Sequence, residues 1–283
     1  MDRCGPAATV AFFERDDRCG VSTLATMARS WKKPGLGGSL LYSVLAFIVS
    51  GVVATFARLE IARSQQRTTA LRGLPPGGLI VVANHTSIAD GVFLALAGRQ
   101  LGRPLRMVGT AGIIEAPVLG RVFRALGFIA VRRKGPNPSE ALRPAADALR
   151  AGEAIALYPE GRITRNDRFW PERAKTGAVR LAIETGVPII ALASIGAHRV
   201  VGRRRRLLSL VTAVFRRPSV TMRLGRPFSA RAFLGLPPTG PVPDPMPADV
   251  RAASDEMMRQ LVALVAELRR ESPPDPIGVP RTD

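Results

Sequence analysis

The order of apolar and polar positions divides the chain into a polar tail, one long uncharged stretch and a region of short alternating segments. Residues 34–57 contain no charged side chain. As a helix, this stretch would be about 36 Å long, compared with about 30 Å for the hydrocarbon core of a bilayer. We therefore predict a membrane-spanning or interfacial helix within residues 34–59, preceded by a basic, flexible segment over 1–33. A re-entrant helix and a buried core helix are the alternatives.

From about residue 74, short apolar runs alternate with amphipathic stretches. Short apolar runs are typical of buried strands, and the amphipathic stretches are typical of helices that cover a sheet. The predicted strands are Leu79–Ala83, Leu105–Val108, Phe128–Val131, Ala154–Tyr158, Ile189–Ala193 and Val220–Leu224. The predicted helices are Asp90–Leu101, Ile113–Leu126, Ser139–Ala151 and Glu172–Glu184. This alternation predicts an α/β domain over 70–235, with a central, mostly parallel sheet flanked by helices.

The pattern changes again after this domain. Residues 236–247 are dense in proline and predict a linker. Residues 248–271 carry apolar side chains at helical spacing, which predicts a C-terminal amphipathic helix that packs on the domain. The remaining residues, 272–283, form a tail.

The charge of the chain is strongly positive, since 41 Lys and Arg face 22 Asp and Glu for a net charge of +19. Such a chain favours polyanions such as nucleic acid, an anionic membrane or phosphorylated molecules. We find no nucleic-acid-binding pattern and expect no nucleic-acid partner. In the segment His198–Arg217, arginines flank an apolar run, which suits insertion at an anionic bilayer surface. The alternative is a buried helix or strand beside a solvated arginine loop.

Cysteine and histidine are too sparse for several classes of site. The two cysteines, Cys4 and Cys19, lie in the N-terminal tail, and the two histidines, His85 and His198, are far apart. No zinc-ligand spacing, nucleophile elbow, phosphate-binding loop or dinucleotide fingerprint is present in the sequence. We therefore expect no metal and no bound cofactor.

Candidate catalytic and binding residues follow two of the predicted strands. The run from Val81 to Asp90 passes from an apolar strand into a polar turn that holds His85. A histidine on the turn and an aspartate at the start of the next helix would make a general base, because the carboxylate fixes the tautomer of the imidazole. The alternative is a helix cap beside an ordinary turn histidine. The second strand end runs through Glu160, Gly161 and Arg162, where a carboxylate and a guanidinium could bind hydroxyl and phosphate groups.

Together and in this order, these segments resemble the glycerolipid acyltransferase family. Asn84–Asp90 resembles the family's His-x-x-x-x-Asp block, and Tyr158–Gly161 resembles its Pro-Glu-Gly block. The other similar segments are Gly127–Arg132, Lys175–Ala178, Val187–Ile190 and Val220–Pro227. The resemblance implies a glycerolipid-acyltransferase-like α/β fold. Two departures stand out, because Arg162 directly follows Gly161 where the family usually has threonine, and Ala191 replaces a second proline.

The resemblance also implies roles for individual residues. His85 and Asp90 would be catalytic, with attack on the thioester by the acceptor itself. The residues that would bind substrate are Arg132, Glu160, Gly161, Arg162 and Lys175. The supporting residues would be Asn84, Ser87 and Thr164, with Ser87 as an alternative nucleophile.

The implied activity is that of an O-acyltransferase of phospholipid biosynthesis. It would move a fatty acyl group from acyl-CoA or acyl carrier protein to the hydroxyl of 1-acyl-glycerol-3-phosphate, giving phosphatidic acid. The expected location is the cell membrane, single-pass or monotopic, with the catalytic domain on the cytoplasmic face. Alternatives are another lysolipid, aminolipid or glycolipid acceptor, a thioesterase, and a non-catalytic basic membrane-binding or nucleic-acid-binding protein on the same fold.

Overall fold

The computed structural model describes residues 35–62, 73–114, 117, 119–131, 138–203 and 206–274. The predicted segment 1–33 and most of the predicted tail lie outside these residues. Arg132 also lies outside them, so its predicted role is left as a prediction.

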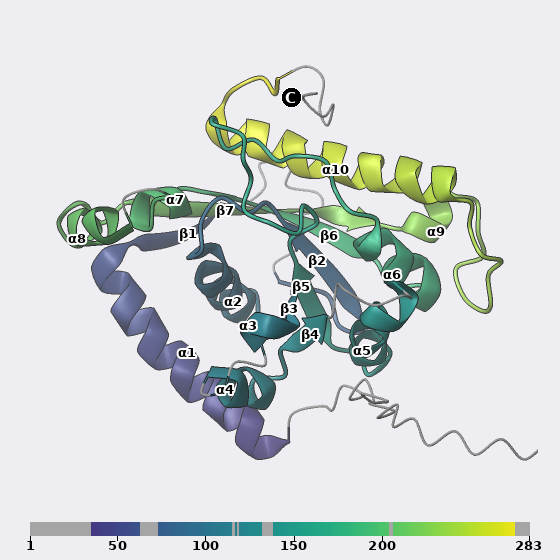
Figure 1. The fold of residues 1–283 in the computed structure, drawn as a ribbon, viewed down its shortest axis with the longest axis horizontal. Coiled ribbons are helices and arrows are strands. Elements are labelled where there is room, and N and C mark those ends of the chain that lie inside the picture. Colours follow the sequence, from purple (N-terminus) through teal and green to yellow (C-terminus); the bar gives the residue numbers. More distant parts are fainter. Residues whose placement is uncertain are drawn as a thin grey trace, which may run out of the picture.

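Seven strands form one sheet within the described part of the chain, in the order β1-β7-β6-β2-β5-β3-β4 (Figure 1). The strands are β1 (Arg58–Ala62), β2 (Leu79–Ala83), β3 (Leu105–Thr110), β4 (Ile129–Val131), β5 (Ala154–Leu157), β6 (Ile189–Ile195) and β7 (Ser219–Phe228). All neighbouring strands are parallel except β6 and β7, which are antiparallel. The predicted mostly parallel α/β sheet is confirmed.

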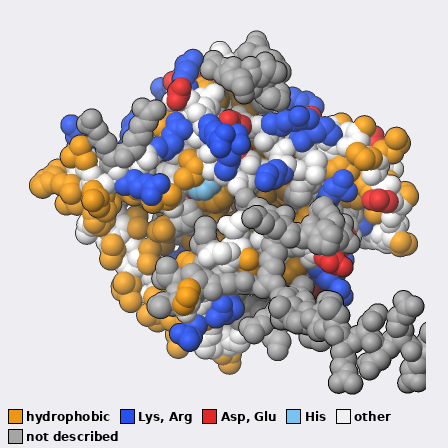
Figure 2. All heavy atoms as spheres, in the orientation of Figure 1, with side chains coloured by type: hydrophobic (Ala, Val, Ile, Leu, Met, Phe, Trp, Pro, Cys, Tyr) orange, Lys and Arg blue, Asp and Glu red, His pale blue; other side chains and the backbone are white. Residues whose placement is uncertain are grey.

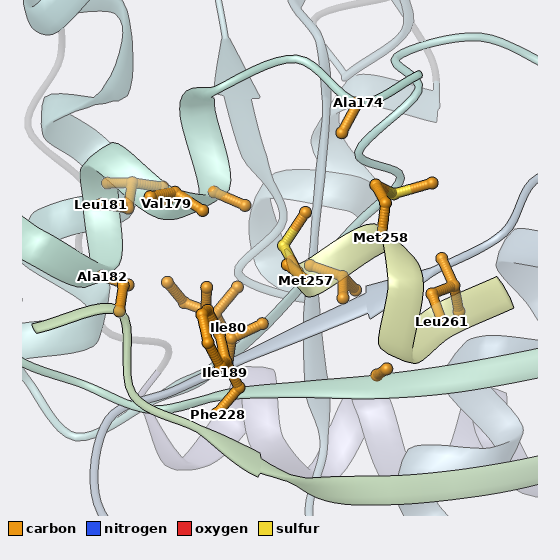
Figure 3. Close-up of a cluster of buried hydrophobic side chains, with 14 of the residues drawn as sticks. Ile80, Ala174, Val179, Leu181, Ala182, Ile189, Phe228, Met257, Met258 and Leu261 are labelled. Atoms are coloured by element: carbon orange, nitrogen blue, oxygen red, sulfur yellow. The ribbon is translucent and has the colours of Figure 1, made fainter. Parts of the chain in front are cut away.

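Helices cover both faces of the sheet, which is why the central strands are apolar throughout. Along β2, Ile80 and Val82 join one buried cluster, while Leu79, Val81 and Ala83 join the other. Three helices pack on the first face, namely α5 (Pro138–Arg150), α6 (Gly177–Thr185) and α10 (Pro247–Arg269). Figure 3 shows part of this first cluster, where Met257 of α10 lies toward Ile80 and Ile189, and Met258 lies toward Ala174.

The second face carries α2 (Asp90–Gln100) and α1 (Leu36–Phe56), which runs along the side of the domain in Figure 1. Helix α1 is bonded to the domain at two positions. The Tyr42 hydroxyl donates to the Ala95 carbonyl at 3.2 Å, and the Arg217 guanidinium donates to the Ala54 carbonyl at 2.7 Å. By length and composition, α1 is the one helix among the described residues that could cross a membrane.

The remaining helices are short and include two corrections to the predicted pattern. They are α3 (Ala111–Ile114), α4 (Leu119–Ala125), α7 (Ala197–Val200), α8 (Arg206–Arg216) and α9 (Ala230–Phe233). The predicted helix over 113–126 is replaced by α3 and α4, with Pro117, which cannot donate a helical hydrogen bond, between them. The predicted helix over 172–184 begins only at Gly177, because Glu172 is held by the turn after β5.

Candidate active site

The turn between β2 and α2 brings His85 and Asp90 together. His85 Nδ1 lies 3.0 Å from Asp90 Oδ2, so the contact between histidine and aspartate that the predicted general base requires is present in the structure. A Nδ1–H that donates to this carboxylate leaves Nε2 as the nitrogen able to accept a proton. Because the His85 side chain is 18% exposed and that of Asp90 only 2%, the base can be reached while its partner is enclosed.

Asp90 is fixed by the backbone of the same turn. Its Oδ2 accepts hydrogen bonds from the amides of Thr86, at 2.5 Å, and Ser87, at 2.7 Å. Asp90 is also the first residue of α2, where the amide dipoles favour a negative charge. The carboxylate therefore has one position, and that position sets the orientation of the imidazole.

Tyr158 covers one face of the His85 ring, a contact that our sequence interpretation missed. The two rings are stacked, with centroids 3.9 Å apart and an interplanar angle of 11°. Burial, and then the Asp90 charge, raise the pKa of Tyr158 well above its usual value, so the phenol stays neutral. The stack restricts rotation of the imidazole and places a π face beside any positive charge that it gains. The only signal in the sequence was an aromatic residue directly before Pro159.

Glu160 joins two loops around this pair. Its Oε1 accepts from the His85 amide at 3.3 Å, and its Oε2 accepts from the Glu172 amide at 3.0 Å. In the same place, the Thr164 amide donates to the His85 carbonyl at 2.7 Å. Glu160 is 5% exposed and both of its oxygens serve the backbone, so the structure gives it a positioning role rather than the predicted contact with substrate.

The buried Glu160 carboxyl makes stability depend on pH. Burial raises the pKa of Glu160 from 4.5 to about 7, while the amide bonds from Glu172 and His85 oppose the rise. In the unfolded chain the group ionises near its ordinary pKa, so the folded state binds more protons between these two values. The contribution of Glu160 to the free energy of unfolding should therefore fall by up to about 3 kcal/mol as pH rises through that window.

We expect Glu160→Gln to remove this contribution, so the difference in unfolding free energy between the wild type and the variant should shrink as pH rises, although the variant also loses one acceptor oxygen and starts from a lower stability. Urea unfolding of both proteins in detergent at a series of pH values measures this difference. Parallel curves for the wild type and the variant would contradict the assignment.

The three residues that were predicted to support the site form hydrogen bonds with other parts of the fold. The Asn84 side chain exchanges two hydrogen bonds with the backbone of Ser194, both at 2.8 Å, and so ties the end of β2 to β6. The Ser87 hydroxyl donates to the Val201 carbonyl at 2.7 Å and is buried, which argues against Ser87 as a nucleophile. Thr164 Oγ1 donates to the Trp170 carbonyl at 2.8 Å and shapes the loop after Gly161.

Gly161 allows a lysine to lie across the turn. Its φ of +70° is in the left-handed region, and a Cβ there would lie 3.1 Å from the Lys175 Cε. Arg162 is exposed and forms an ion pair with Glu172 at 3.0 Å. The predicted substrate-binding residues Gly161, Arg162 and Lys175 thus lie around one turn.

A cavity of about 960 Å³ opens beside His85 and Tyr158. Most of its lining is apolar and comes from α1, α2, β3, α4, the loop between α4 and β4, and β4, and includes Leu45, Val49, Val92, Met107, Phe123, Leu126, Phe128 and Val131. Its cationic lining residues are Arg162, Lys175 and Arg180. Arg180 was not predicted, although its place on α6, five residues after Lys175, was a visible signal. An apolar cavity with a base and three cations fits a molecule with a hydrocarbon chain and an anionic group.

The comparisons with known proteins show which kind of domain this one resembles. Residues 65–195 match the family model described as Acyltransferase. The fold also matches the crystal structure of the 1-acyl-sn-glycerophosphate (LPA) acyltransferase PlsC from Thermotoga maritima, with a TM-score of 0.57 and 18% identity over 84% of this chain and 83% of that one. Over residues 65–195 the chain is therefore similar to the Acyltransferase family, and its fold is similar to that of PlsC.

Relatives of known name state a particular activity. The chain is 26% identical to the chloroplastic 1-acyl-sn-glycerol-3-phosphate acyltransferase BAT2 of Brassica napus over 43% of its own length and 34% of the relative. It is 29% identical to a 1-acyl-sn-glycerol-3-phosphate acyltransferase of Limnanthes douglasii, over 42% of this chain and 41% of that one. The predicted resemblance to glycerolipid acyltransferases is confirmed, while the match spans only about a third of the length of BAT2.

Proposed function

We propose that this protein is a membrane-associated O-acyltransferase that converts 1-acyl-glycerol-3-phosphate to phosphatidic acid, with acyl-CoA or acyl carrier protein as the acyl donor. The observation that carries the proposal is the His85–Asp90 pair beside a mostly apolar cavity that also has cationic side chains. The relatives from Brassica napus and Limnanthes douglasii are named for the same acceptor, which supports this choice.

The geometry supports direct attack by the acceptor. An alcohol is neutral at pH 7, so its oxygen needs a base that removes the proton as it attacks the thioester carbonyl. His85 Nε2 would take that proton, and Asp90, at 3.0 Å from Nδ1, would stabilise the resulting imidazolium. The C–S bond then breaks, and the thiolate of CoA or of the carrier protein takes the proton back from His85. No acyl-enzyme is needed, in keeping with the bonded hydroxyl of Ser87.

The cations of the cavity would bind the phosphate of the acceptor. Arg162 is already paired with Glu172, so Lys175 and Arg180 are the residues of this set without a carboxylate ion pair among the described residues. We expect Lys175→Met to raise KM for lysophosphatidic acid about tenfold or more, with a smaller change in kcat, because a charge-assisted hydrogen bond is lost. Steady-state kinetics should show little change with an uncharged monoacylglycerol as the acceptor. An equal loss for both acceptors would contradict a phosphate contact.

The proposal is tested by acyl transfer in detergent-purified protein. Labelled oleoyl-CoA, and in parallel oleoyl-acyl carrier protein, is offered with lysophosphatidic acid and with a panel of other lysolipids and glycolipids. Labelled phosphatidic acid is the expected product. Product from another acceptor alone would move the proposal to that lipid, and free fatty acid formed without any acceptor would indicate a thioesterase. No product from either donor with folded protein would favour a non-catalytic binding protein.

Membrane association at the cell membrane, with the domain on the cytoplasmic face, belongs to the same proposal. It is supported by the 21-residue apolar helix α1. An 18-residue stretch of this helix has a mean hydropathy of 2.1, and only 11% of the stretch is buried in the domain. Because α1 is bonded to the catalytic domain at Tyr42 and at Ala54, we favour a helix that enters the bilayer along the side of the domain over one that crosses it alone.

A further inference from the structure

Helix α8 presents an apolar stripe that no other described part of the chain covers. Leu207, Val211 and Phe215 are spaced four residues apart, so they lie on one side of the helix, and they are 80%, 57% and 83% exposed. Leu208 and Val214 are also exposed and border this stripe. The opposite side is anchored in the domain by Ala213, which is 1% exposed. A folded helix rarely leaves its larger apolar side chains in water without a partner.

The stripe is continuous with the exposed side of α1. The two helices pack against each other, and the Arg217 guanidinium reaches the Ala54 carbonyl near the end of α1. Figure 2 shows hydrophobic side chains on the same side of the molecule over both helices. The exposed apolar residues of α1 are Leu36, Leu40, Val44, Phe47, Ile48 and Val52. We call this combined surface the α1–α8 face.

Positive charge borders the α8 part of this face. Arg206 at the start of the helix and Arg216 and Arg217 at its end are all exposed. The sequence contains no acidic residue between Val201 and Ser219. An apolar stripe with cationic ends and no negative charge matches the acyl boundary and the phosphate layer of an anionic bilayer. A second copy of this chain fits poorly, because each copy carries a net charge of +19 and would bring arginines against arginines.

We propose that α8 inserts its Leu207–Val211–Phe215 stripe into an anionic bilayer beside α1, so that the α1–α8 face docks the enzyme on the membrane at two places. The proposal rests on the membrane association included in the proposed function, but not on acyl transfer. With α1 and α8 in the bilayer, the cavity lies directly behind α1, since Tyr42, Leu45, Ala46 and Val49 of α1 line it. A lysolipid in the bilayer would then have a short path to His85, which lines the same cavity.

The test reads the depth of α8 directly, because α1 alone could hold the protein on vesicles. In a full chain with Cys4→Ser and Cys19→Ser, an environment-sensitive NBD probe is attached to Val211→Cys. The matched control is Met246→Cys, an exposed apolar position before α10, the helix on the other face of the sheet. Vesicles of phosphatidylglycerol and phosphatidylcholine, with and without doxyl-labelled acyl chains, serve as the bilayer.

We expect a several-fold rise in NBD emission at position 211 and strong quenching by the doxyl lipids, with neither at position 246. Arg206→Gln with Arg216→Gln should weaken the signal at 211, by about fivefold in apparent lipid affinity for each arginine. Emission at 211 that stays as low as at 246 would overturn the proposal. A rise without quenching, together with crosslinking between copies, would also overturn it in favour of a self-association surface. Neither NBD emission nor quenching depends on catalysis. Failure of this proposal can therefore be told apart from failure of the proposed acyltransferase function.

Discussion

Replacement of His85 by alanine is expected to lower kcat for acyl transfer by about 10²–10⁴-fold, because a positioned base contributes this much to alcohol attack. His85 is also the histidine that lines the cavity. The assay measures labelled phosphatidic acid formed from oleoyl-CoA at saturating acceptor. Binding of the protein to vesicles should be unchanged, since His85 is not on the α1–α8 face.

The other histidine supplies the matched control. His198 stacks on Phe169, with ring centroids 4.1 Å apart, and is not among the residues that line the cavity. Burial, then the charges of Arg199 and Arg269, lower the pKa of His198 to about 4, so it is neutral near pH 7. We expect His198→Gln to keep kcat close to that of the wild type. A His85→Ala protein that retains activity within a few-fold, or a His198→Gln protein that loses it, would contradict the assignment of the base.

The central strands were predicted well from the sequence because burial on both faces of the sheet gives an uninterrupted apolar run. β2 occupies the predicted residues Leu79–Ala83, and all five are buried. The strand β1 was not predicted. Arg58 and Glu60 alternate with Leu59 and Ile61 at the edge of the sheet, and its strand partner, β7, lies far away in the sequence. A short edge strand with charged residues depends on that partner, which no local pattern contains.

Part of the candidate site could also be predicted from the local sequence, and part could not. The pairing of His85 with Asp90 was predictable because both lie within one strand–turn–helix unit, where spacing sets distance. Glu160 was assigned to substrate, whereas its two oxygens accept the amides of His85 and Glu172 from other segments. The stack of Tyr158 on His85 joins the ends of two neighbouring strands, β2 and β5, whose register appears only in the folded sheet. Contacts between residues far apart in the chain were therefore the ones that the sequence did not predict.

Substitution of Asp90 should separate its two tasks, to anchor the turn and to stabilise the imidazolium. Three donors converge on Oδ2, namely the amides of Thr86 and Ser87 and the Nδ1 of His85. In Asp90→Ala all three lose their acceptor. Each buried amide left without a partner costs about 1–3 kcal/mol, so the unfolding free energy should fall clearly and activity should be lost together with it.

Asp90→Asn is the informative variant. Its amide oxygen can take the place of Oδ2 and accept the same three hydrogen bonds, while its NH₂ points to the Thr86 hydroxyl, which lies 3.4 Å from Oδ1. The turn and the tautomer of His85 are then kept, and only the negative charge is removed. We expect near wild-type stability in urea unfolding with kcat reduced at least about 10²-fold, because the imidazolium formed during attack has lost its counter-charge. If kcat instead follows stability in both variants, Asp90 acts only as an anchor of the turn, and His85 works as a base without an electrostatic partner.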